Sequence, residues 1–285
     1  MDYTIRGWVR ILLFIIPYFF VVGLLQLIGS LIAGVDFMNP EAVITSVQKR
    51  WLQVFGMFGT FLILWLFMKY VDREKFVELG FHTKNRTWEF LFGNGLGAVI
   101  MGGGLLLLLA IDEISIAEIN FEPAQFLMSI ILFAIVALVE EVLFRGYILK
   151  NLMLSFNKPL ALVVSSILFS LAHGANPNVN LFSLFELFLA GILLGVSYLY
   201  TRNLWFPIAL HFSWNFFQSL FGFNVSGQDF YSLIELNYGS SNLLNGGAFG
   251  FEGSIFAAIS SVAIIAWIIY YYQKNPEKAL AERVT

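Results

Sequence analysis

Long apolar runs recur along the whole chain and are separated by short polar segments. A transmembrane helix needs about 20 mostly apolar residues to cross the roughly 30 Å hydrocarbon core of a bilayer. The pattern predicts such helices near 8–33, 51–70, 90–111, 124–149, 158–176, 181–200, 204–221 and 254–273. We therefore expect an all-α, polytopic membrane protein with about eight transmembrane helices, embedded in a lipid bilayer.

Composition supports this class and excludes others. Hydrophobic residues make up 59% of the 285 residues and charged residues only 12%, whereas soluble domains contain about 25% charged residues. A net charge of −3 argues against nucleic-acid binding, which requires a basic face. Because the chain contains no cysteine, disulfides, thiolate metal sites and a cysteine nucleophile are excluded.

The basic residues indicate the orientation, because cytoplasmic loops of membrane proteins carry an excess of Lys and Arg. With the N-terminus in the cytoplasm, the outer segments hold only Lys49 and Arg50, and the outer loop 112–123 is acidic. The inner segments then hold Arg6, Arg10, Lys69, Arg73, Lys75, Lys84, Arg86, Lys150, Lys158, Arg202, Lys274, Lys278 and Arg283. We therefore predict that both termini are cytoplasmic.

Three charged residues interrupt the apolar run at 124–149. An ionisable group at the bilayer centre costs roughly 2.5–3.5 kcal/mol, so such residues indicate function. Glu141 and Arg145 are four residues apart and share a helix face in a favourable order. Glu140 is rotated by about 100° from Glu141, so it needs a partner from another helix.

Candidate partners are present on two later helices. His173 ends the motif FSLAH, four residues after Phe169, and His211 and Asn215 are again four residues apart. Two carboxylates, two imidazoles, one guanidinium and one carboxamide thus come from three predicted helices. We predict one functional site formed by Glu140, Glu141, Arg145, His173, His211 and Asn215.

The predicted helix at 181–200 carries two further features. Gly191 and Gly195 form a small-xxx-small pattern that favours close helix packing. Glu186 has no basic partner nearby in the sequence. Three interpretations of Glu186 stay open: a protonated packing residue, a partner of Arg145, or a substrate contact.

Three motifs, EEVLFRG at 140–146, FSLAH at 169–173 and HFSWN at 211–215, resemble those of the CAAX-prenyl-protease and bacteriocin-processing family, also called CPBP or Abi. The resemblance covers about residues 124–220. It suggests three parts: N-terminal helices at 1–123, a CPBP-type protease core at 124–221, and a C-terminal part at 222–285. The C-terminal part would comprise an external loop or half-buried cap at 222–253, the last transmembrane helix and a cytoplasmic tail.

The resemblance implies an intramembrane endopeptidase that hydrolyses a hydrophobic or membrane-associated peptide or protein. By that resemblance, Glu140 would activate a water, while Glu141 and Arg145 would orient and tune it. His173 would hold the water or a metal, and His211 and Asn215 would stabilise the oxyanion. A bacterial member of the family would reside in the inner membrane.

The residues alone decide neither whether a metal takes part nor which class of function the protein has. Glu and His are good ligands for a divalent metal such as zinc, but the chain lacks the His-Glu-x-x-His pattern of zinc proteases. A metal-free glutamate mechanism is the alternative. Two other functions compete with a protease: a non-catalytic binding or bacteriocin-immunity protein of the same fold, and a proton-coupled transporter that relays protons through its glutamates.

Overall fold

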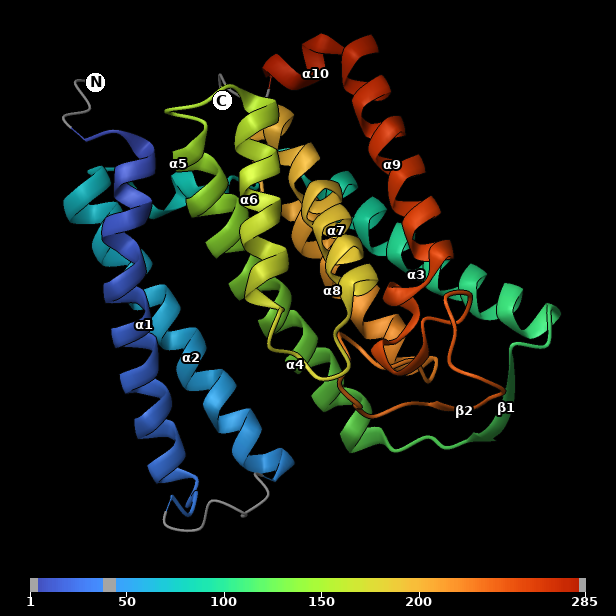
Figure 1. Ribbon diagram of the computed structural model, residues 1–285. Helices are drawn as coiled ribbons and strands as arrows, with labels where there is room; N and C mark the ends of the chain where they lie inside the picture. The colour runs from blue at the N-terminus through green and yellow to red at the C-terminus, as the bar shows by residue number, and fades with distance from the viewer. Residues whose placement is uncertain (1–4, 38–44, 282–285) are drawn as a thin grey trace.

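The first two helices form a hairpin at one side of the molecule. In the computed structural model, which describes residues 5–37 and 45–281, α1 (Gly7–Ile32) packs along α2 (Ser46–Phe67). A capping box at Thr45 and Gln48 begins α2, and the π-helix η1 (Met68–Asp72) extends it. Figure 1 shows this hairpin in blue, leaning away from the other helices at one end.

The remaining helices pack around the middle of the chain. α4 (Pro123–Glu141) continues through the π-helix η3 (Val142–Leu149) into the short α5 (Lys150–Leu152). α6 (Lys158–Ala172) packs on α7 (Leu181–Thr201), and α3 (Thr87–Ala110) packs on α8 (Trp205–Leu220). α9 (Ile255–Lys274) lies against α7 and is followed by α10 (Pro276–Ala281) (Figure 1).

Six helical runs among residues 5–37 and 45–281 are long and apolar enough to cross a membrane. They are Gly7–Ile32, Arg50–Asp72, Thr87–Ala110, Pro123–Leu152, Leu181–Thr201 and Ile255–Lys274. The predicted all-α membrane fold is thereby confirmed, but the count of eight is not. α6 has 15 residues and α8 has 16, so both are shorter than the roughly 20 residues that a full span needs.

A small sheet covers one end of the helices, where the sequence predicted an outer loop at 112–123 and an external loop or half-buried cap at 222–253. β1 (Ile114–Ile119) pairs in antiparallel fashion with β2 (Ile234–Tyr238), with an irregularity between Ile116 and Glu118. Two 3₁₀ turns, η4 (Gly247–Phe249) and η5 (Phe251–Gly253), follow β2. Segments 112–122 and 222–253 therefore form one cap on the helices (Figure 1).

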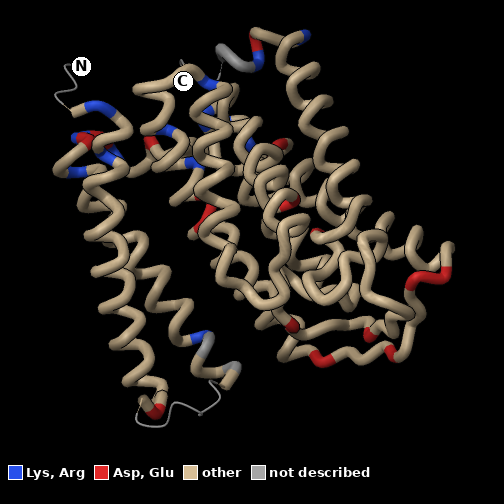
Figure 2. The backbone as a smooth tube through the Cα atoms, in the orientation of Figure 1, with Lys and Arg blue, Asp and Glu red and all other residues tan. Residues whose placement is uncertain are grey.

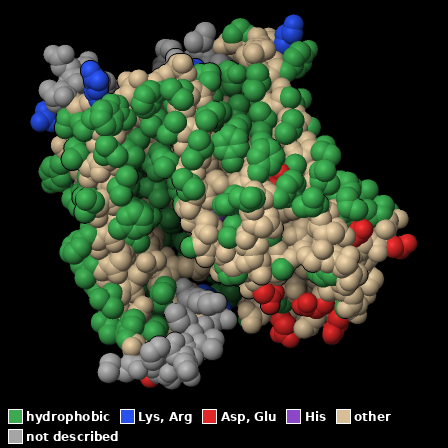
Figure 3. Space-filling model, in the orientation of Figure 1, with side chains coloured by type: hydrophobic (Ala, Val, Ile, Leu, Met, Phe, Trp, Pro, Cys, Tyr) green, Lys and Arg blue, Asp and Glu red, His purple; other side chains and the backbone are tan. Residues whose placement is uncertain are grey.

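The two ends of the molecule carry opposite charge. Figure 2 shows most Lys and Arg at the end where α1 begins and α10 lies, and several Asp and Glu near the sheet. Apolar side chains cover the surface between these ends in the view of Figure 3. Large exposed examples are Ile16, Phe19 and Val99. Since such a surface is incompatible with water but suits lipid, the protein is an integral membrane protein.

The basic end is held together by contacts between distant segments. Asp72, which the sequence analysis placed in a loop, is the buried last residue of η1 and pairs with buried Arg10. The 3₁₀ turn η2 (Phe76–Leu79) docks on α7, because the hydroxyl of Tyr198 donates to the carbonyl of Leu79 at 2.9 Å. These contacts join α1, α2 and α7 at one end.

Small residues allow the closest helix packing. A Cβ atom on Gly191 would lie 2.8 Å from the Cα of Ser166 in α6, as the small-xxx-small pattern predicted. A Cβ atom on Gly97 of α3 would lie 2.8 Å from the backbone nitrogen of Trp214 in α8. Because α8 carries His211 and Asn215, the Gly97 contact sets the position of two predicted site residues.

We expect Gly97→Leu to destabilise the protein by about 1–3 kcal/mol, because overpacking forces α3 and α8 apart. Gly95→Leu is the matched control, since a Cβ at Gly95 would meet nothing within 4 Å and the change in helix propensity is the same. The measurement is the melting temperature of each variant in detergent. Equal melting temperatures for the two variants would contradict this packing.

Candidate active site

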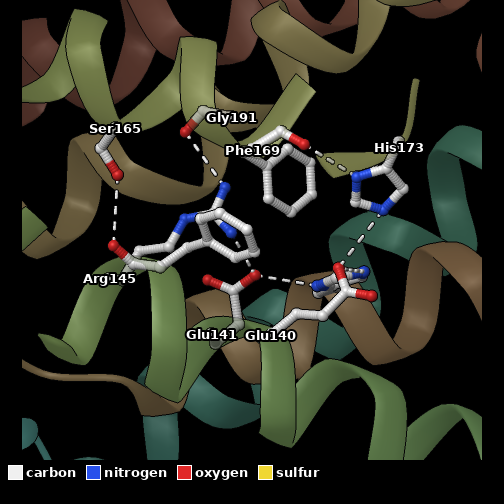
Figure 4. Close-up of polar contacts among 9 residues, drawn as sticks. Glu140, Glu141, Arg145, Ser165, Phe169, His173 and Gly191 are labelled. Atoms are coloured by element: carbon white, nitrogen blue, oxygen red, sulfur yellow. Dashed lines mark hydrogen bonds and ion pairs between the residues drawn. The ribbon is translucent and has the colours of Figure 1, made fainter. Parts of the chain in front are cut away.

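Glu141 is the most deeply buried charged residue of the predicted site, with an exposed fraction of 0% for its side chain. Its Oε1 accepts a hydrogen bond of 2.7 Å from Nη1 of Arg145, one turn later in the chain. Nδ1 of His211 lies 2.8 Å from the same oxygen (Figure 4). Arg145 also donates through Nη2 to the carbonyl of Gly191 at 3.2 Å. Glu141 thus links α4, η3, α7 and α8.

The backbone changes its winding directly after Glu141. The π-helix η3 begins at Val142, and all eight of its residues are buried. A π-helix widens the turn and is common at functional sites. It also leaves carbonyls without regular helical partners; the hydroxyl of Ser165 donates to the carbonyl of Phe144 at 3.2 Å. The buried Arg145 therefore lies in a widened turn that is supported from α6.

Glu140 points away from Glu141 and faces two histidines, as the 100° rotation between neighbouring residues required. Its Oε2 lies 3.5 Å from Nε2 of His173 and 4.0 Å from Nε2 of His211. Figure 4 shows Glu140 and His173 directed toward each other. These distances are too long for good hydrogen bonds, so this oxygen faces the histidines without being fully bonded to either.

Hydrogen bonds on the far side of each ring fix the histidine tautomers. A carbonyl only accepts, so Nδ1–H of His173 donates to the carbonyl of Phe169 at 2.8 Å. Oε1 of Glu141 already accepts a hydrogen bond from Arg145, so His211 donates to the same oxygen through Nδ1–H. In their neutral forms, both rings therefore present an unprotonated Nε2 toward Glu140. The two Nε2 atoms and the Glu140 oxygen are all hydrogen-bond acceptors, so a shared proton or a donor such as a water molecule between them would be stabilised.

Phe169 fills the space between the charged groups. Its ring centroid lies 4.4 Å from the guanidinium carbon of Arg145 and 4.7 Å from the ring of His173. The ring of His211 is 6.3 Å away in an edge-on arrangement. Sequence analysis used Phe169 only to place His173 on a helix face, whereas the structure gives it contacts with three site residues.

A cavity of about 700 Å³ opens in front of this cluster. Glu140, His173, His211 and Asn215 all line it. Most of the remaining wall is apolar and comes from α1, α4, α6 and α7, and Gln53 of α2 also contributes. The structure therefore brings all six predicted site residues together: Glu140, His173, His211 and Asn215 at the cavity, and Glu141 and Arg145 behind it.

The cap contributes residues that the sequence analysis missed. Ser226, Gln228 and Glu252 line the same cavity, and they come from the segment predicted as an external loop or half-buried cap. No motif links them to the helices, so the only signal was an acidic residue, Glu252, just before the last apolar run. Their place in the wall depends on how the cap folds back.

The hydrogen bonds of Arg145 exclude one of the three interpretations of Glu186. Arg145 is hydrogen-bonded to Glu141 and Gly191, so Glu186 is not its partner.

Among the described residues, no group of three or more His, Cys, Asp and Glu side chains is arranged to hold a metal ion. We therefore derive no chemical step through a metal.

Comparison with known proteins gives one match. Residues 122–217 match the family model described as type II CAAX prenyl endopeptidase Rce1-like. This segment runs from the start of α4 into α8 and includes all six predicted site residues. No curated protein and no solved structure matched the chain. Residues 122–217 are therefore similar to the Rce1-like CAAX prenyl endopeptidases, which supports a CAAX-type intramembrane protease kind of function.

Proposed function

We propose that the protein is an intramembrane endopeptidase in which Glu140 activates a water molecule to hydrolyse a peptide bond. The observation that carries this proposal is the position of Glu140 Oε2, which lines the cavity 3.5 Å from Nε2 of His173. A carboxylate and an unprotonated imidazole nitrogen at this distance can each accept a hydrogen bond from one water. Such a water presents its lone pair to a bound carbonyl.

The proton transfers follow from this arrangement. Glu140 removes a proton from the water as its oxygen attacks the carbonyl carbon, and a tetrahedral oxyanion forms. The protonated Glu140 then donates that proton to the leaving amine, and the carbon–nitrogen bond breaks. His173 keeps its orientation through its bond to the carbonyl of Phe169, so it positions the water throughout.

His211 and Asn215 are placed to stabilise the oxyanion. They lie one turn apart on α8, and both line the cavity. Asn215 donates through its amide without carrying charge. His211 can donate through Nε2 only when that nitrogen is protonated, and Glu141 is then its counter-ion at 2.8 Å. Preorganised donors of this kind act most strongly where water is scarce.

The wall of the cavity and the charge distribution support a membrane-bound substrate. Apolar residues predominate in the wall, which suits a hydrophobic or membrane-associated peptide. The basic end of the molecule carries the start of α1 and α10 (Figure 2). Because cytoplasmic segments are rich in Lys and Arg, we place this end in the cytoplasm and the cap on the other side. A bacterial inner membrane fits this orientation.

Replacing Glu140 tests the mechanism. We expect Glu140→Gln to lower the cleavage rate by about 100-fold or more, because the amide cannot take the proton from water. His173→Ala should cause a similar loss, while Asp229→Asn, an exposed acid of the cap, should cleave normally. The measurement is turnover of quenched apolar peptides by purified protein in liposomes. Unimpaired turnover by Glu140→Gln would refute the assignment.

Replacing Arg145 tests the buried pair behind the cavity. Arg145→Met leaves Glu141 charged and buried, so we expect the free energy of unfolding to fall by about 3–5 kcal/mol. The double variant Glu141→Gln/Arg145→Met should regain most of that stability, because both charges are gone, yet its turnover should stay low. Denaturant titration in micelles measures stability. An equal loss in the single and double variants would contradict the pairing.

Chelation tests the metal-free form of the mechanism. Because the described donors do not form a metal site, we expect the cleavage rate to stay within about twofold when a zinc chelator is added. A zinc protease of known chelator sensitivity serves as the control. Loss of turnover on chelation and recovery on adding zinc would show that the donors rearrange around a metal.

A further inference from the structure

The cavity has a second polar wall, formed where the cap meets the end of α6. Asn176 from the segment after α6 lines the cavity, together with Ser226, Gln228 and Glu252 from the cap. Glu140 and Glu252 thus line one cavity but come from different segments of the chain. Glu140 lies within the part of the chain that matches the family model, and Glu252 lies outside it.

The turn at Ser226 is held rigidly from both sides. The side chain of Asn178 donates to the carbonyl of Gly227 at 3.0 Å, and the backbone nitrogen of Gly227 donates to the carbonyl of Phe249 at 2.9 Å. Ser226 itself has a φ of 50°, a left-handed conformation that non-glycine residues seldom adopt outside constrained sites. The cap thus presents Ser226 in one fixed orientation.

Glu252 is fixed against this turn. Its Oε1 accepts a hydrogen bond from the backbone nitrogen of Ser226. Its two chain neighbours, Phe251 and Gly253, are both buried, so the backbone on either side is anchored. The carboxylate is also close enough to His173 and His211 to interact with them electrostatically. It is therefore a preformed acidic group at the edge of the site of Glu140.

Glu186 lies behind Glu252. Its exposed fraction is only 4%, and its buried Oε1 has no hydrogen-bond partner among the described residues. Both glutamates line a second, much smaller cavity of about 20 Å³, together with Trp214 and Ser261. Two neighbouring carboxylates repel each other when both are ionised, so a cation beside them would stabilise the charged forms.

The charges around the cavity favour a cation. Within the described part of the chain, no Lys or Arg lines the cavity, and Arg145 behind it is paired with Glu141. The lining acids are Glu140 and Glu252. Burial raises the pKa of the Glu252 carboxyl above its ordinary value, which means that the ionised form is costly there until a positive group approaches.

We propose that Glu252, backed by Glu186, is a subsite that binds a cationic group of the substrate, either a Lys or Arg side chain or a free α-ammonium group. This inference rests on the proposed function, because it takes the cavity to be the peptide-binding site. The apolar wall and Glu252 together select a peptide with a hydrophobic segment and a positive charge close to the cleaved bond.

Binding to the Glu140→Gln protein tests the subsite without cleavage. Three fluorescent apolar peptides of equal length are compared by anisotropy: acetylated with one Lys, acetylated with norleucine in its place, and the norleucine peptide with a free N-terminus. We expect at least one cationic peptide to bind about 10-fold more tightly than the neutral one. Adding Glu252→Gln should abolish this preference, whereas adding Asp229→Asn should preserve it.

The preference is a ratio of affinities measured on one preparation, so partial unfolding of a variant does not alter it. Equal binding of all three peptides to the Glu140→Gln protein, or a preference that survives Glu252→Gln, would overturn the subsite. Failure of the proposed function looks different: the unmodified protein would cleave none of the peptides, while the Glu140→Gln protein would still prefer the cationic ones.

Discussion

The site is organised around one buried acidic side chain that has polar partners on two sides. Glu141 has no access to solvent, and it is stabilised by the guanidinium of Arg145 on one side and the imidazole of His211 on the other. Removing one member of such a buried group leaves the other charge uncompensated. The same contacts align α8 with α4, and the bond from Arg145 to Gly191 adds α7. Glu140, the adjacent residue, takes its direction from this arrangement.

Two helices that carry predicted site residues, α6 and α8, are shorter than a full membrane span. α6 ends at Ala172, and His173 is its C-terminal cap. With 15 residues, the helix is about 22 Å long, so it brings His173 to the inside of the protein rather than to a membrane surface. α8 begins at Trp205, and His211 lies two turns further on. These two short helices thus carry His173, His211 and Asn215 at the wall of the cavity.

Sequence reasoning could predict the residues that meet but not the walls around them. Charges within an apolar run are improbable, and helical spacing relates Glu141 to Arg145 and His211 to Asn215. The fold class follows from the same apolar pattern. The sheet of the cap was not predicted because β1 and β2 pair residues more than 100 positions apart, even though apolar and polar residues alternate along β2. Glu252 and His173 share the cavity wall although they are far apart in the sequence, so no local pattern indicates that they meet there.

The residues that line the cavity come partly from the segment that matches the family model and partly from segments outside it. The proposed hydrolytic groups lie within residues 122–217, which the family model matches, while Ile11, Tyr18 and Gln53 from the first hairpin and Glu252 from the cap complete the wall. Substitutions in the hairpin and the cap can therefore reshape the cavity without touching those groups. In such a protein, catalysis and selectivity are able to evolve separately.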